Sequence, residues 1–311
     1  MDRRDVLKSV AIAAAGAGMA AAGASAVSAS SAKFGGPAAR VLRMPYLETA
    51  DGTTLFYKDW GAGTPIIFVH SWSANSDMWQ YQMTPLVAQG TRCIAYDRRG
   101  HGRSSQPGRG YDYDTLADDL AAVIEQLDVR NATLVGHSMG AGDIARYLSR
   151  HGASRVDRIV FLAPTLPFIL QTPDNPAGVP KEFFDEVRAQ WSKDFPKWLA
   201  DNARPFFAPD TSAAMIEWAV AMSAQCPIKV AIDCNRAVTE TDFRGELPKI
   251  TVPTLIIQGD KDVSVPLDFT GRRTAELIPG SHLKVYEGAA HGLMFTHIDR
   301  LNGDLIEFVQ G

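Results

Sequence analysis

The pentapeptide Gly136-His137-Ser138-Met139-Gly140 carries the residue types of a reactive serine in a G-x-S-x-G pattern. It follows the apolar run 132–135 and opens a helical pattern over 139–149, which is the strand, turn and helix setting of a nucleophile elbow. In such a turn the flanking glycines let strand and helix approach closely. The helix N-terminus then favours negative charge that develops beside the hydroxyl. The motif therefore predicts Ser138 as a nucleophile.

A serine hydroxyl needs a general base and a carboxylate that orients the base. After the apolar run 255–258, the chain reads Gly259-Asp260-Lys261-Asp262, and His291 follows a predicted strand at 282–286. The carboxyl ends of parallel strands meet at one edge of a sheet. We therefore expect Ser138, one of the two aspartates and His291 to meet there.

Alternating strands and helices must position these residues. Two predicted strands at 41–48 and 54–60 flank an Asp-Gly turn signal. Short apolar runs that suit buried parallel strands then alternate with helical patterns. The apolar runs are 65–69, 93–96, 133–135, 159–162 and 254–257, and the helical patterns are 78–89, 115–127, 139–149, 269–277 and 301–309. An opening hairpin followed by strand–helix repeats predicts a mostly parallel α/β sheet with helices on both faces.

Residues 164–248 interrupt this alternation. They carry ten prolines and three helical segments, 181–202, 211–225 and 228–238, without a convincing strand. A stretch of this length is too long for a loop. We expect a helical lid inserted between the core segments 41–163 and 249–311, with some of its many aromatic residues lining an apolar pocket.

Together these motifs resemble the α/β-hydrolases of the cofactor-free haloperoxidase and aryl esterase group, from about residue 45 to the C-terminus. Besides the serine and histidine motifs, the resemblance is carried by 97–104 (DRRGHGRS), 239–244 (TETDFR) and 259–266 (GDKDVSVP). It implies an eight-stranded sheet with the lid after the sixth strand. It also implies serine esterases that often form peracids from carboxylic acids and hydrogen peroxide.

The resemblance assigns Ser138 as nucleophile, His291 as base and Asp262 as the carboxylate, with Asp260 as the rival. The oxyanion hole is expected from the backbone N–H groups of Met139 and Trp72.

The loop before Trp72 reads His70-Ser71, where the family usually has His-Gly. A serine resists the positive φ that a glycine tolerates, so the geometry of this loop stays open. His70, His101 and His137 are expected to pack or to hold loops rather than to do chemistry.

Composition narrows the possible partners. The 311 residues are 46% apolar and carry a net charge of −4. The chain therefore lacks the excess of basic residues that would bind nucleic acid or an anionic membrane surface. No Cys/His cluster or dinucleotide motif appears, so we expect no metal and no cofactor. Three cysteines do not make a disulfide scaffold, although a bridge between Cys226 and Cys234 stays open.

The N-terminal residues 1–32 read as a targeting signal. Arg3 and Arg4 precede an uncharged Ala/Gly-rich stretch over 10–24 and small-residue cleavage options near Ala26 and Ala29. This pattern resembles a twin-arginine export signal and is too short for a membrane span. It predicts a periplasmic or secreted protein.

The sequence thus predicts a serine hydrolase for small carboxylic esters, which can also use peroxide. Lactone, amide or carbon–carbon bond hydrolysis on the same residues is the alternative within this chemistry. A ligand-binding or sensing protein without turnover is the alternative of another class. The natural substrate and the oligomeric state, a homo-oligomer included, stay open.

Overall fold

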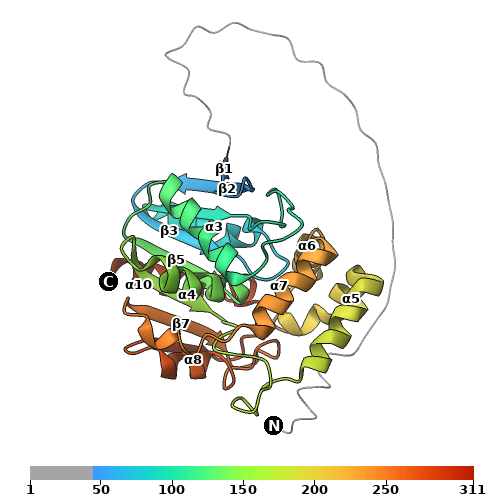
Figure 1. The fold of residues 1–311 in the computed structure, drawn as a ribbon. Coiled ribbons are helices and arrows are strands. Elements are labelled where there is room, and N and C mark those ends of the chain that lie inside the picture. Colours follow the sequence, from blue (N-terminus) through green and yellow to red (C-terminus); the bar gives the residue numbers. More distant parts are fainter. Residues whose placement is uncertain (1–44) are drawn as a thin grey trace, which may run out of the picture.

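A computed structural model describes residues 45–311 as one sheet with helices on both faces (Figure 1). The predicted signal segment 1–32 and the start of the first predicted strand lie outside the described residues. The eight strands run in the order β1-β2-β4-β3-β5-β6-β7-β8. They are β1 (Tyr46–Glu48), β2 (Thr54–Gly61), β3 (Thr64–Val69), β4 (Thr91–Tyr96), β5 (Ala132–His137), β6 (Val156–Leu162), β7 (Thr254–Gly259) and β8 (His282–Tyr286).

Only β2 runs opposite to the other strands, so both of its pairings are antiparallel. β1 pairs antiparallel with β2, and β2 pairs antiparallel with β4, while the pairs from β3 to β8 are parallel. The central strand β5 is buried at every position, as its uninterrupted apolar run predicts. All strands that precede the predicted site residues therefore point their carboxyl ends to one edge.

Two hydrophobic cores lie on opposite faces of this sheet, because alternate residues of each strand point to opposite sides. In β3, Ile67 and Val69 pack into one core and Ile66 and Phe68 into the other. The first core is covered by α3 (Tyr113–Gln126) and α4 (Met139–His151) together with residues at the end of α8 (Gly271–Leu277). The second is covered by α2 (Gln80–Ala88), α9 (Leu293–Thr296) and α10 (Ile298–Gln310). Figure 1 shows α3 and α4 in front of the sheet and α10 behind it.

The segment between β6 and β7 is helical and stands at one end of the sheet (Figure 1). It contains α5 (Lys181–Asn202), α6 (Ala213–Ser223) and α7 (Ile228–Glu240), with the short turns η2 (Arg204–Phe206) and η3 (Leu247–Lys249). We call residues 164–248 the lid segment. Its helices α5 and α7 contribute Trp191 and Val230 to the first core, so the segment is packed against the sheet domain.

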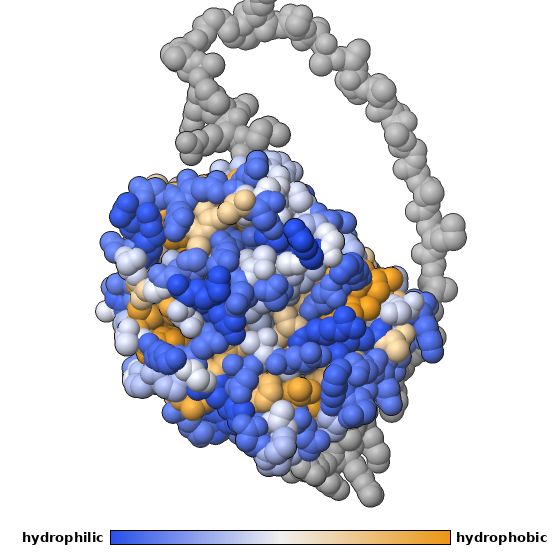
Figure 2. All heavy atoms as spheres, in the orientation of Figure 1, coloured by the Kyte–Doolittle hydropathy of each residue, from blue (hydrophilic) through white to orange (hydrophobic). Residues whose placement is uncertain are grey.

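The face in Figure 2 is largely hydrophilic, with several small separate apolar patches, one of them where α5 and α6 lie. Within residues 45–311, no helix is long and apolar enough to cross a membrane.

Candidate active site

Ser138 occupies a strained turn between β5 and α4. Its φ of 55° and ψ of −115° lie in a region that residues with a side chain rarely adopt. Two glycines allow the tight approach around it. A Cβ on Gly136 would come within 2.5 Å of the Gly140 carbonyl oxygen, and a Cβ on Gly140 within 2.5 Å of the Val69 carbonyl oxygen. The turn therefore has the backbone geometry of a nucleophile elbow.

Asp262 and His291 meet in a short buried contact beyond the ends of β7 and β8. The Nδ1 atom of His291 lies 2.7 Å from Oδ2 of Asp262, and both residues are 4% exposed. An ionised carboxylate can only accept, so Nδ1 carries the proton and Nε2 keeps a free lone pair. The arrangement can therefore present Nε2 as a general base.

The Asp262 carboxylate is itself held from two directions. Its Oδ1 accepts the backbone N–H groups of Ser264 at 3.0 Å and Val265 at 2.9 Å. Its Oδ2 also accepts from the side-chain amide of Gln258, at 3.3 Å. These donors orient the carboxylate toward the imidazole.

Asp260 has a different environment. Its Oδ1 accepts the backbone N–H of Gly288 at 2.7 Å, and this bond lowers the pKa of the carboxyl. Lys261 lies 3.3 Å from the same carboxylate. In the recorded hydrogen bonds of residues 45–311, Asp260 has no contact with His291. The structure thus brings Asp262, and not Asp260, to the histidine.

The loop after β3 carries the predicted oxyanion donor Trp72. Within this loop the positive φ falls on Ser73, at 57°, and not on Ser71. The substitution of the usual glycine at Ser71 therefore does not strain the backbone. The Trp72 indole donates its N–H to the Ala231 carbonyl of α7 at 2.7 Å. It packs against Trp191 and Trp198 of α5, with ring centroids 4.6 Å and 6.2 Å away.

We call Trp72, Trp191 and Trp198 the indole cluster. We call residues 70–73 the oxyanion loop, after the predicted donor Trp72. The indole cluster joins this loop to α5, and the bond from Trp72 to Ala231 joins it to α7.

A cavity of about 400 Å³ lies between the lid segment and this edge of the sheet. Ser138 and His291 both line it, as do Trp72 and Trp191. Its lining is otherwise mostly aliphatic and aromatic, and among the described residues it contains no Asp, Glu, Lys or Arg. A charged ligand would lose its hydration there without a compensating partner. The cavity therefore suits an uncharged, largely apolar molecule.

His137 contacts the predicted general base, His291, through both a hydrogen bond and its ring. Its Nε2 donates to the His291 carbonyl oxygen at 3.1 Å, and the two ring centroids lie 4.6 Å apart. Burial lowers the pKa of His137 well below its usual value, so the ring stays neutral. This is the loop-holding role expected from the sequence.

Three further residues near the site were not singled out as functional from the sequence. Gln258 is a polar residue in the fully buried strand β7, where it supports Asp262. Asp143 is a fully buried acid on α4, and it pairs with the equally buried Arg98. The available signal for Gln258 was a polar residue inside an apolar strand, and that for Asp143 was an acid on the buried face of a helix.

Within residues 45–311, no cluster of His, Cys, Asp and Glu could hold a metal ion.

Comparison with known proteins places this chain in a family. Residues 64–226 match the family described as the alpha/beta hydrolase fold. The chain is 42% identical over 275 residues to the non-heme chloroperoxidase CPO-A1 of Kitasatospora aureofaciens, which covers 86% of this chain and 99% of that protein. It is 38% identical over 275 residues to the bifunctional esterase/perhydrolase DCH of Acinetobacter calcoaceticus, with 86% of this chain and all of that protein covered.

A solved structure extends the likeness to three dimensions. An esterase from Exiguobacterium antarcticum superposes with a TM-score of 0.83 at 34% identity, covering 86% of this chain and 99% of that one. The chain belongs to the α/β-hydrolase fold family, within its cofactor-free haloperoxidase and esterase group. The predicted fold class and the predicted family are confirmed.

Proposed function

We propose that this protein is a serine hydrolase that cleaves small uncharged carboxylic esters through an acyl-enzyme on Ser138. The observation that carries the proposal is the buried Asp262–His291 bond beside a cavity that Ser138 also lines. The strained backbone at Ser138 adds to this support, because such strain clusters at catalytic turns.

In the first half of the proposed cycle, Nε2 of His291 takes the hydroxyl proton as Oγ of Ser138 attacks the ester carbonyl carbon. The N–H groups of Trp72 and Met139 hold the negative oxygen of the tetrahedral intermediate. The carbon–oxygen bond to the alcohol then breaks, and the imidazolium returns its proton to the leaving oxygen. The Asp262 carboxylate stabilises the imidazolium between these two transfers.

In the second half, His291 takes a proton from water as the water oxygen attacks the acyl carbon. The bond between the acyl carbon and Oγ of Ser138 then breaks, and the imidazolium returns the proton to Oγ. Hydrogen peroxide in place of water would give a peracid by the same bond changes. The names of the chloroperoxidase and esterase/perhydrolase relatives support this second use of the acyl-enzyme. Peracid formation from acetate and hydrogen peroxide, measured with wild type and with Ser138→Ala, tests it.

The first prediction concerns the nucleophile. We expect wild type to hydrolyse p-nitrophenyl acetate and butyrate, and Ser138→Ala to lose on the order of 10⁶-fold in kcat, because no acyl-enzyme can form. Release of p-nitrophenolate measures both. A wild type that is inactive across a broad ester panel, or an active Ser138→Ala, would exclude the serine esterase.

We also propose that residues 1–32 direct export to the periplasm or the medium. The adjacent Arg3 and Arg4 before an Ala/Gly-rich stretch support this. N-terminal sequencing of protein purified from its native host should then begin shortly after Ala26 or Ala29. A mature chain that still begins at Met1 would exclude cleavage.

A further inference from the structure

The oxyanion loop is held from the side of the sheet by one buried guanidinium. Arg98 lies just past the end of β4 and is fully buried. Its Nη2 donates to the His70 carbonyl oxygen at 2.5 Å, and its Nη1 points to the Ser71 carbonyl oxygen at 3.4 Å. Both carbonyls belong to the two residues that directly precede the proposed donor Trp72. Arg98 therefore contacts the backbone that sets the position of the Trp72 N–H.

The same guanidinium is anchored to the helix that carries the other proposed donor. Its Nε donates to Oδ2 of Asp143 at 2.7 Å. Asp143 lies on α4, one turn after Met139, whose N–H is the second donor. One side chain thus links the loop of the first donor to the helix of the second.

His70 completes the arrangement. Its Nε2 accepts the backbone N–H of Arg98 at 2.9 Å, so Nδ1 carries the ring proton and donates to the Ser71 carbonyl oxygen at 2.8 Å. Burial lowers the pKa of His70 well below its usual value, which keeps the ring in this neutral form. Arg98 is therefore bonded to the loop through both its guanidinium and its backbone N–H, and it is the donor in each of these bonds.

A buried ion pair is weak support for stability alone, because desolvation of both charges offsets most of their attraction. Geometry at an oxyanion hole matters more, since donors act within about 2.7–3.1 Å of the oxygen. We propose that Arg98 and Asp143 are positioning residues that set the distance between the oxyanion donors Trp72 and Met139. This inference rests on the acyl transfer proposed above.

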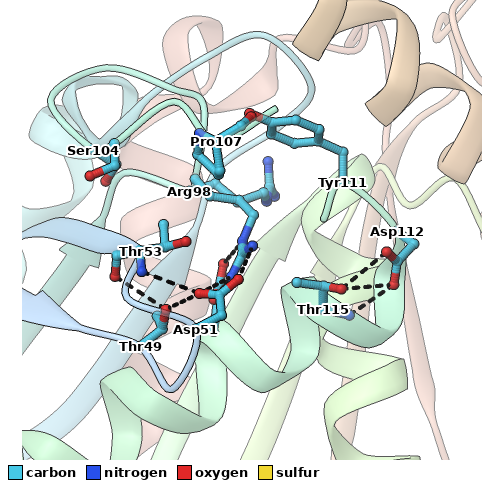
Figure 3. Close-up of polar contacts among 12 residues, drawn as sticks. Thr49, Asp51, Thr53, Arg98, Ser104, Pro107, Tyr111, Asp112 and Thr115 are labelled. Atoms are coloured by element: carbon cyan, nitrogen blue, oxygen red, sulfur yellow. Dashed lines mark hydrogen bonds and ion pairs between the residues drawn. The ribbon is translucent and has the colours of Figure 1, made fainter. Parts of the chain in front are cut away.

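The chain offers a matched control at the next residue. Arg99 is also buried, and its Nε and Nη2 bond the two oxygens of Asp119 on α3 at 2.6 Å and 2.7 Å. It also reaches Asp51, at 2.9 Å. In the recorded hydrogen bonds of residues 45–311, its guanidinium has no partner in the loop 70–73. Figure 3 shows Asp51 bonded to Thr49 and Thr53 in the turn between β1 and β2.

The test compares two charge-neutral double variants, Arg98→Met with Asp143→Asn and Arg99→Met with Asp119→Asn. The first removes a buried pair without leaving a lone charge, and the second leaves only the half-exposed carboxylate of Asp51 without its arginine. We expect the Arg98 variant to lose roughly 10- to 100-fold in kcat on p-nitrophenyl acetate, because a displacement near 1 Å at a catalytic group costs about that much. Its KM should stay within about threefold, since ground-state binding does not use the oxyanion hole.

The Arg99 variant should show a comparable fall in melting temperature with kcat within about twofold of wild type. Arg98→Lys, which keeps the charge but not the planar fork, should not restore kcat. Equal kcat losses in the two double variants, or an unchanged kcat in a folded Arg98 variant, would overturn the positioning role. If the Arg98 double variant does not fold, Arg98→Lys alone decides, because it keeps a charge opposite Asp143: an unchanged kcat overturns the role, and a lower kcat at constant KM supports it. An inactive wild type would instead overturn the proposed function and this inference with it.

Discussion

Asp260 and Asp262 lie two residues apart after β7, and their carboxylates bond different partners. Asp262 is buried and bonded to His291, whereas Asp260 holds the backbone of Gly288. In the sequence alone, the two carboxylates of the Gly-Asp-x-Asp pattern are equivalent candidates. Only the resemblance to a family favoured Asp262, and the structure places it against the histidine.

We expect Asp262→Asn to lower kcat on the order of 10⁴-fold, because the amide would stabilise the wrong tautomer of His291. Asp260→Asn should keep kcat within about tenfold and act mainly on stability, through its bond to Gly288. Hydrolysis of p-nitrophenyl acetate by the two variants, measured side by side, checks this. A larger loss in Asp260→Asn would reverse the assignment.

The candidate triad could be predicted because each of its residues follows a strand end, and strand ends in a parallel sheet converge. The pairing of Arg98 with Asp143 could not be predicted in this way. Arg98 follows β4 and Asp143 lies inside α4, and nothing in their spacing of 45 positions indicates a contact. Only the packing of α4 across the sheet brings them together.

At the scale of elements, the close packing of β5, α4 and β3 depends on two glycines, Gly136 and Gly140. Gly140→Ala would place a methyl group within 2.5 Å of the Val69 carbonyl oxygen, an atom that cannot move without displacing β3. We expect a loss of roughly 1–3 kcal/mol in the free energy of unfolding. Urea denaturation measures this loss.

Gly303→Ala is the matched control for this change. Gly303 lies inside α10, and a Cβ there would meet nothing within 4 Å. This substitution should stabilise the protein by about 0.5–1 kcal/mol, because alanine is the better helix former. If both alanines had the same effect, close packing at the elbow would not be the cause.

The helices agree with the sequence less closely than the strands. The helical pattern over 181–202 is one helix in length, but Asp194 inside it has non-helical angles, φ −158° and ψ 82°. Pro196 explains the break, since proline clashes with the preceding turn and cannot donate a hydrogen bond. Similarly, the predicted helix 78–89 divides into the short turn η1 (Ser76–Trp79) and α2. Hydrophobic periodicity detects a helix but is insensitive to such interruptions.

At the scale of the whole molecule, three buried histidines link stability to pH. Burial lowers the pKa of His101 to about 3 and those of His70 and His137 well below the usual value. The unfolded chain binds a proton at each near pH 6.5, and the folded chain does not. Stability from these groups is therefore complete above about pH 6.5 and declines as the pH falls.

Below about pH 5.5, these three histidines together should lower the free energy of unfolding by about 4 kcal/mol per pH unit, since each contributes about 1.4. The raised pKa values of the buried Asp119, about 6, and of Asp143 act in the opposite direction and reduce the net slope. Urea denaturation at pH 7.5, 6.5, 5.5 and 5.0 measures the slope. His101→Asn should reduce the slope by about 1.4 kcal/mol per pH unit, because its amide can replace the Nδ1 bond to the Arg99 carbonyl but does not titrate. A stability that is flat between pH 6.5 and 5.0 would contradict this account.

The indole cluster has an optical consequence. Its rings lie 4.6–6.2 Å apart at interplanar angles of 32–88°. Indoles this close, and not parallel, share their electronic excitations, and such coupling produces paired bands of opposite sign in circular dichroism. Because Trp72 belongs to the oxyanion loop and Trp191 and Trp198 to the lid segment, any separation of lid from loop uncouples them. The protein therefore carries a built-in spectroscopic reporter of whether its active site is assembled, one that needs neither substrate nor label.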